Sequence, residues 1–245
     1  MMEIVITDLT YMRKGFCIAG INTKTGKNIR PVLPFGQIQE EFINKNKIYP
    51  GSVIKFLFSD TKVNPPHVED YIFKPDTTEF VRCLTILEWV DILESHASSS
   101  LASAFNNLII DQKKVAPNAN TSSLALIKIE RIRFTFFDRD RDDSTLPFKI
   151  RASFTSEDKD HFYHLTVTDK QFFDYCKKRF DEGLSKDKLK TELDECINSS
   201  TYIYLRIGLS RPYKKPGDKE QWCYLQVNGI YSERLDKKIR YILHQ

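Results

Sequence analysis

Tyr202–Tyr231 reads YIYLRIGLSRPYKKPGDKEQWCYLQVNGIY, and this stretch decides how the rest of the chain is interpreted. Apolar residues alternate with aromatic and charged ones in both of its arms, at Ile203, Leu205, Ile207, Leu209, Cys223, Leu225 and Val227. A period of two residues is typical of a strand with one buried face. The stretch therefore predicts a β-hairpin with an aliphatic face, a basic connecting loop and an opposite face that carries aromatic rings and Arg206.

The composition indicates a folded protein. Of the 245 residues, 41% are hydrophobic and 12% aromatic, which is enough for one large domain or two ordinary ones. The 37 basic residues exceed the 33 acidic residues and give a formal charge of +4. This mild excess is compatible with a polyanionic partner and equally with ordinary solubility.

The cysteines and the N-terminus bear on where the protein works. Five cysteines is an odd number without CxxC spacing, which argues against a zinc ribbon and a disulfide framework and predicts reduced, buried thiols. The start MMEIVITDL is predicted to be a strand rather than a signal peptide, and no apolar run approaches the roughly 20 residues of a membrane span. We expect a soluble cytoplasmic protein with no membrane partner.

The first half of the chain predicts short strands followed by helices. Alternation and turn residues place the strands at Glu3–Leu9, Phe16–Ile21, Asn28–Val32 and Ser52–Phe58, with a hairpin turn at Thr25–Gly26. Thr85 and Glu88 form the pattern of a capping box at the start of one helix, and a second helix is predicted from Ser100. The polar run Gln112–Ser123, which contains Pro117, predicts a boundary between domains at 1–117 and 118–245.

The second half predicts a recognisable order of elements. Strands are expected at Leu124–Phe137, with a bulge near Glu130 and Arg131, and at Phe148–Phe154 and Phe162–Thr168; helices starting after Asp169 and Ser185 precede the hairpin. Three strands, helices and two strands is the order of the OB-fold, a five-stranded Greek-key barrel. We predict a mainly β (α+β) protein of two OB-like barrels in tandem with inserted helices. One mixed α+β domain and an unrelated pair of barrels are the alternatives.

Five segments also resemble a known family. These are VITDLTYMRKGFCIAGINTKTGKNIRPV, PPHVEDY, SSLALIKIERIRF, YLRIGLSRPY and WCYLQVNGIY, in this order along the chain. Together they resemble the dual OB domain-containing protein family of prokaryotes. The resemblance implies two OB-like barrels, no established catalytic activity and a nucleic-acid-binding role, often suggested for bacterial antiviral defence. The last segment, SERLDKKIRYILHQ, departs from the family's aromatic-proline ending and is expected to form a helix.

The loop Arg211–Lys219 is the first candidate site. It would join the fourth and fifth strands of the second barrel, where OB-folds commonly hold oligonucleotides. Its cations can neutralise phosphates and its aromatic neighbours can stack bases. The candidate nucleic-acid-binding residues are Arg30, Arg206, Arg211, Tyr213, Lys214, Lys215, Trp222 and Tyr224. Packing of the aromatic rings between the barrels remains open, and for Arg206 an ion pair with a carboxylate of the other barrel is as good an interpretation as phosphate binding.

Other polar clusters give weaker signals. His67, Glu69 and Asp70 could hold a metal or act as acid and base, although such loops more often use these side chains for turn hydrogen bonds. His161 and His164 would point to opposite faces of a strand. The run Arg139–Asp143 is expected to be a solvated turn.

The sequence lacks a P-loop, a GxGxxG fingerprint, HExxH and GxSxG, so no enzyme class and no cofactor is indicated. We expect a non-enzymatic accessory or sensor module for single-stranded or structured RNA or DNA. One alternative is a protein-interaction subunit whose barrels dock an enzyme or ATPase partner. The other is a small-nucleotide sensor, or a hydrolase that uses His67, Glu69 and Asp70.

Overall fold

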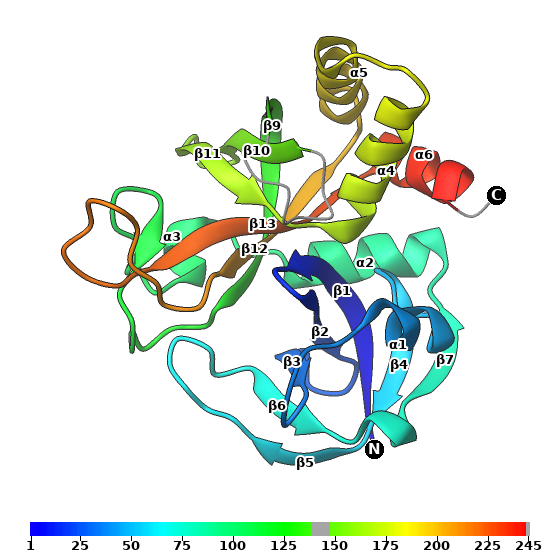
Figure 1. Cartoon of the computed structure of the whole chain (residues 1–245), viewed down its shortest axis with the longest axis vertical. Helices are drawn as coiled ribbons and strands as arrows, with labels where there is room; N and C mark the ends of the chain where they lie inside the picture. Colours follow the sequence, from blue (N-terminus) through cyan, green and yellow to red (C-terminus); the bar gives the residue numbers. More distant parts are fainter. Residues whose placement is uncertain (139–147, 244–245) are drawn as a thin grey trace.

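The computed structural model describes residues 1–138 and 148–243, and it shows two β structures stacked along the long axis of the molecule (Figure 1). The first half of the chain forms the lower one and the second half the upper one, with the strand β13 (Cys223–Ser232) running between them. Within these described residues, no helix is both long enough and apolar enough to cross a membrane. All five cysteines are free; three are buried as expected, whereas Cys17 is only partly buried and Cys83 is exposed.

The first sheet curls into a half-barrel, which we call the first barrel. Its strand order is β5-β6-β3-β2-β1-β4-β7. The strands are β1 (Met2–Met12), β2 (Gly15–Asn22), β3 (Asn28–Val32), β4 (Ser52–Phe56), β5 (Phe58–Thr61), β6 (Asp70–Phe73) and β7 (Glu79–Cys83). Antiparallel pairing of β1 with β4 and parallel pairing of β3 with β6 follow the OB plan, with β4 and β5 sharing the place of one strand. A short helix that we did not predict, α1 (Glu40–Lys45), lies between β3 and β4.

The second sheet closes into the predicted OB-like barrel. Its strands are β9 (Leu124–Asp138), β10 (Phe148–Ser156), β11 (His161–Val167), β12 (Ile203–Leu209) and β13. They pair in the order β11-β10-β9-β12-β13, and parallel pairing of β11 with β13 closes the ring. Helices α4 (Lys170–Asp181) and α5 (Lys186–Asn198) stand between the third and fourth strands, and α6 (Glu233–Leu243) follows the last. The fold class and the C-terminal helix are confirmed.

Several local signals in the sequence explain where these elements begin and bend. The register between β9 and β10 skips Glu130, which confirms the bulge. Asp169 caps α4 by accepting from the Phe172 amide at 3.1 Å. Thr85 and Glu88 make the reciprocal capping box of α2 (Ile86–His96), which a single 3-10 turn, η1 (Pro75–Thr77), and β7 precede. The helix expected from Ser100 is only one turn long, α3 (Leu101–Ala104), because Asn106 and Asn107 adopt positive φ angles.

The segment between the two barrels belongs largely to the second one. The side chains of Leu101, Phe105 and Val115 are buried in the core that the second barrel builds. Lys114 and Val115 form the two-residue strand β8, which pairs with β13. Packing against the second barrel therefore starts before the expected boundary at residue 117.

The hairpin of β12 and β13 is buried on both faces, so packing between the barrels, one of the two interpretations left open for its aromatic side, is the one found. Its aliphatic side fills the second barrel. On the other side Tyr204 and Tyr231 join Val5, Trp89 and Leu93 from the first half in a separate buried cluster. The rings of Trp89 and Tyr231 meet edge to face with centroids 5.0 Å apart. The hairpin is thus the joint between the barrels.

Candidate nucleic-acid interface

Arg206 is the centre of a buried ion pair that links the two barrels. Its Nε lies 2.9 Å from Oδ2 of Asp8 on β1, and both residues are 1% exposed. Its Nη1 donates to Oδ1 of Asn28 at 3.2 Å. A guanidinium in this position cannot reach a phosphate on the surface. The structural ion pair, which the sequence left open, is the arrangement found, and the phosphate-binding interpretation of Arg206 is corrected.

Arg30 is also used inside the protein. Its Nη1 lies 2.9 Å from Oδ1 of Asp70, and its Nη2 donates to Ser123 Oγ of the second barrel at 2.7 Å. Arg30 is 5% exposed, so it too is a structural cation rather than a phosphate ligand. Arg211 reaches the same carboxylate from the other barrel, with Nη2 2.5 Å from Asp70 Oδ2 and a side chain that is 47% exposed.

The weak metal candidates fasten the barrels together. The Glu69 carboxylate accepts from the Ser123 amide at 2.7 Å and from the Ser123 hydroxyl at 2.8 Å. His67 Nε2 lies 3.2 Å from the carbonyl oxygen of Leu209. Across residues 1–138 and 148–243, no three His, Cys, Asp or Glu side chains gather in a way that could hold a metal. His67, Glu69 and Asp70 thus each serve an inter-barrel contact.

The remaining weak signals are not part of a common site. His161 Nδ1 lies 2.9 Å from the Thr155 hydroxyl, whereas the backbone N–H of His164, which has a φ of 57°, donates to the Ser153 hydroxyl at a bulge between β10 and β11. The run Arg139–Asp143 lies outside the described residues.

His67 is expected to make the folded protein sensitive to acid. Burial, and then the charges of Arg211 and Arg30, lower the pKa of His67 from 6.5 to about 4. The unfolded chain therefore takes up a proton near pH 6.5 that the folded chain accepts only near pH 4. The stability that comes from keeping His67 neutral is fully present above pH 6.5. It falls by about 1 to 3 kcal/mol as the pH drops from 6.5 to about 4. Urea unfolding at several pH values measures this loss.

The control for this prediction is His67→Gln, which can still donate to the Leu209 carbonyl but cannot titrate. Its free energy of unfolding should fall less than that of the wild type over the same pH window. Parallel curves for the two proteins would contradict the assignment.

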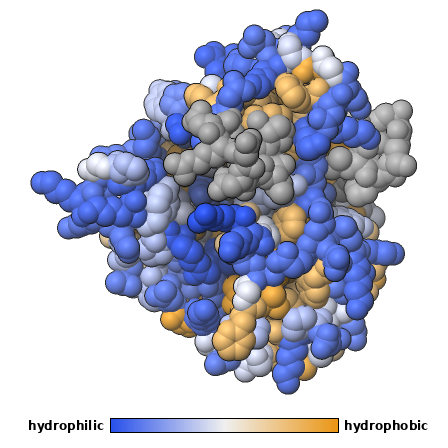
Figure 2. Space-filling view, viewed as in Figure 1, coloured by the Kyte–Doolittle hydropathy of each residue, from blue (hydrophilic) through white to orange (hydrophobic). Residues whose placement is uncertain are grey.

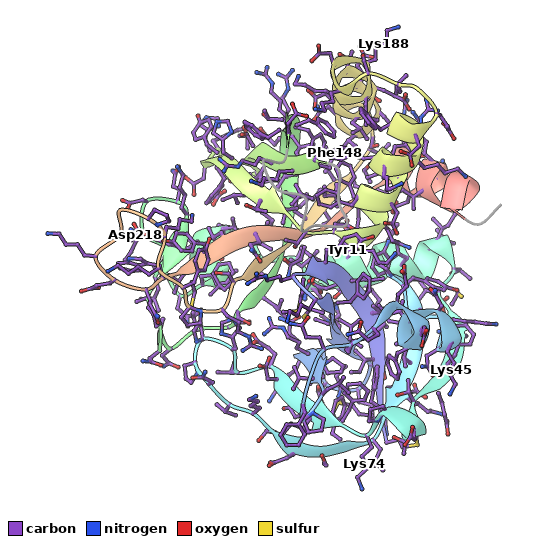
Figure 3. The ribbon with its side chains drawn as sticks, in the orientation of Figure 1. Tyr11, Lys45, Lys74, Phe148, Lys188 and Asp218 are labelled. Carbon is purple, nitrogen blue, oxygen red and sulfur yellow. The ribbon has the colours of Figure 1, made fainter. Side chains whose placement is uncertain are left out.

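The loop between β12 and β13 is a second, exposed hairpin that extends the joint. Tyr213 and Trp222 pair across it, with two backbone hydrogen bonds of 3.1 Å. At its tip the backbone N–H of Asp218 donates to the Lys215 carbonyl at 3.1 Å, and Gly217 takes a φ of 92° that other residues rarely adopt. Asp218 marks this tip at the left edge of Figure 3, and Figure 2 shows a mainly hydrophilic protrusion there.

The aromatic rings of this loop have different roles. Tyr224 is only 7% exposed, its hydroxyl donates to Asp218, and the Lys215 ammonium lies 3.4 Å from its ring centroid. It therefore supports the loop and is covered. Tyr213 is 42% exposed with its ring 4.8 Å from that of Tyr224, which leaves one face for a ligand. Trp222 is half-buried, and the Lys114 ammonium lies 4.4 Å from its ring.

Cations from other parts of the chain surround the loop, and the sequence interpretation missed them. Partial burial lowers the pKa of Lys215, and the charges of Arg151, Lys113 and Lys114 lower it further, against the opposing effect of Asp218. Burial and then the charge of Asp218 raise the pKa of Tyr213, and the charge of Arg151 opposes them. The neighbours thus come from residues 113–114 at the start of β8, from β10 and from the loop, three segments far apart in sequence.

The outer face of β9 and β10 continues this positive surface. Alternation places Arg131 and Arg133 of β9 on the same face as Lys149 and Arg151 of β10, and all four are exposed. Among the residues that the structure describes, none of these four is ion-paired with a carboxylate. Phe137, 39% exposed, and Tyr163, 52% exposed, offer ring surface on the outside of the barrel. In the sequence, these cations could have been located by the charged residues at every second position of each strand.

A family model described as a dual OB-containing domain matches residues 2–230. The chain belongs to this family. Its overlap with the crystal structure of the tetrameric p202 HIN2 is weak, with a TM-score of 0.27 and 10% identity over 94% of this chain and 89% of that one. No curated protein matches the chain.

Because the chain belongs to the dual OB-containing family, the positive surface can be compared with the face that OB-folds use for ligands. In an OB-fold, the second and third strands and the loop between the fourth and fifth strands form the usual face for oligonucleotides. In the second barrel these are β10, β11 and the loop that carries Tyr213 and Lys215. The exposed cations and rings described above lie on these elements or beside them.

Proposed function

We propose that the protein binds single-stranded or structured nucleic acid through one face of its second barrel. We define this basic face by its cations and exposed rings, which are Lys113, Lys114, Arg131, Arg133, Lys149, Arg151, Tyr163, Tyr213, Lys214 and Lys215. The observation that carries the proposal is the position of Lys114 over the Trp222 ring and of Lys215 over the Tyr224 ring, beside the exposed ring of Tyr213. Cations that neutralise phosphates next to rings that stack bases are the two parts of a single-strand site.

The chemistry favours binding with little sequence preference. The side chains that define the basic face are lysine, arginine and tyrosine. Stacking and phosphate contacts tolerate any base, whereas sequence reading needs side chains that match base edges. Trp222 and Arg211 border the basic face and steady its loop, since one packs under Lys114 and the other is held by Asp70.

We propose further that the protein acts as a non-enzymatic accessory or sensor module. The absence of a common catalytic motif from the sequence supports this role, as does the use of His67, Glu69 and Asp70 in holding the barrels together. A part in prokaryotic antiviral defence rests on the family resemblance alone.

The double variant Arg151→Glu/Lys215→Glu tests the basic face. We expect its affinity for a labelled dT or U oligonucleotide to fall by about tenfold or more, because two phosphate contacts become repulsive. The slope of log affinity against log salt should also become shallower by about one to two. Fluorescence anisotropy over a salt series measures both quantities.

The matched control is Lys24→Glu/Lys45→Glu, which changes the net charge equally at two exposed positions of the first barrel. It should keep affinity close to that of the wild type. Equal losses in the two double variants would show a general charge effect and sink the site assignment. No salt-sensitive binding by the wild type would remove the proposed function itself.

A further inference from the structure

A cavity of about 420 Å³ lies between the two barrels, separate from the basic face. The first barrel contributes the end of β1 and the segments around residues 30–38 and 62–70, and the second contributes Leu209–Arg211, Gln226 and Asn228. Tyr11, labelled at the end of β1 in Figure 3, lies at this junction, and its hydroxyl donates to Asp174 of α4 at 2.7 Å. The volume is within the range of about 300 to 1,000 Å³ that small-molecule sites occupy.

The charges around this cavity favour an anion. Lys62, Arg30 and Arg211 line it, and Asp70 is the carboxylate among its lining residues. Arg30 is occupied by Asp70 and Ser123, so the buried carboxylate is already neutralised. Lys62 is exposed and Arg211 is 47% exposed, so both can turn toward a ligand at the rim. A phosphate suits such a pair of cations.

The walls of the cavity are partly apolar and partly polar. Phe16, Leu33 and Ile38 supply an apolar side. His67 and Gln37, which also line the cavity, each keep one buried acceptor atom, Nδ1 and Oε1, without a partner within the described part of the chain. The carbonyl of Leu209 can only accept, so His67 Nε2 carries the proton and Nδ1 has a free lone pair. A matching ligand brings N–H donors.

We propose that this inter-barrel cavity binds a free nucleotide of about the size of a nucleoside monophosphate. Its phosphate meets Lys62 and Arg211, its base lies against the apolar wall of Phe16 and Leu33, and donors on the base serve Gln37 and His67. The walls come from both barrels, so the bound nucleotide bridges them. This assignment is independent of the basic face, to which Lys62 and the apolar wall do not belong.

Isothermal titration calorimetry with the four ribonucleoside monophosphates tests the proposal. At least one should bind saturably at a single site, and inorganic phosphate and the matching nucleoside should each bind at least about tenfold more weakly, since each lacks half of the contacts. Lys62→Glu should weaken nucleotide binding by about tenfold or more, and Leu33→Trp, which fills the cavity, should abolish it. Lys24→Glu is the charge-matched control and should bind like the wild type.

Three outcomes would overturn the cavity assignment. These are no saturable binding of any monophosphate at millimolar concentration, wild-type affinity in Lys62→Glu, and equal affinity for inorganic phosphate alone. Lys62 is exposed, so Lys62→Glu does not disturb the core and tests the cavity even if Leu33→Trp fails to fold. The affinity of Lys62→Glu for the oligonucleotide, measured by anisotropy, should equal that of the wild type. Conversely, Arg151→Glu/Lys215→Glu should keep wild-type affinity for the nucleotide. The two sites can therefore fail separately.

Discussion

Replacing Arg206 with methionine is expected to destabilise the protein by about 3 to 5 kcal/mol, because Asp8 is left as a buried charge without its cation. Methionine fills much of the same volume, so the loss reports the electrostatics rather than a cavity. The remaining donors to Asp8 are the Thr7 hydroxyl at 2.8 Å and the Asn228 amide at 3.4 Å, both neutral. Urea unfolding followed by tryptophan fluorescence measures the change, since Trp89 packs at the joint.

A double-mutant cycle separates this ion pair from its surroundings. Asp8→Asn alone should also destabilise strongly, since Arg206 then has no opposite charge, and Arg206→Met/Asp8→Asn should cost less than the two single changes added together. Additive losses would show that the two side chains are not coupled. Lys128→Met is the control, because Lys128 is paired with Glu157 at the surface, with the side chains 39% and 49% exposed. It should cost no more than about 1 kcal/mol.

The order of elements in the second barrel could be predicted because each signal is local. The alternation of β10, the bulge at Glu130 and the cap at Asp169 depend on neighbours in the sequence, and all three are found. The alternating charged residues of each strand were equally visible in the sequence. The proximity of Arg151 to Lys215, however, arises only when the barrel closes. β8, with only two residues, is too short to show a period, so Lys113 and Lys114 were assigned to a linker.

The covered face of the hairpin could not be predicted for a different reason. Alternation separates apolar from polar positions, but it cannot reveal that a polar face will be buried when its partners lie elsewhere. Arg206 finds Asp8 across 198 positions of sequence, and the Tyr231 hydroxyl finds the Thr7 carbonyl across 224, at 2.5 Å. Each partner satisfies a group that would otherwise have needed water. Arg206, for which the sequence left an ion pair open, and Arg30, a candidate ligand-binding cation, are therefore both structural.

The joint between the barrels gives the two proposed sites a physical connection. Arg211 begins the loop of the basic face and also lines the inter-barrel cavity, while its guanidinium is held by Asp70. A ligand that draws Arg211 toward the cavity would therefore change the support of the loop. The strength of the Asp70 contacts decides how freely this can happen.

Asp70→Asn is the change that measures those contacts, and it is expected to cost about 3 to 5 kcal/mol. Asparagine keeps the shape of the side chain but removes the charge that balances Arg30, which cannot lose its own proton. The side chains of Arg30 and Asp70 are 6% and 1% exposed, so water cannot replace the lost interaction. The free energy of urea unfolding again gives the result.

The exposed partner of the same carboxylate provides the contrast. Arg211→Gln should cost no more than about 1 kcal/mol, because a guanidinium that is 47% exposed regains water when its ion pair is lost. The large loss of stability in Asp70→Asn would then come from the broken contact with Arg30, the cation buried between the barrels. Similar small losses in both variants would instead mean that Arg30 is stable there without a charged partner, and its Ser123 contact would have to account for its position.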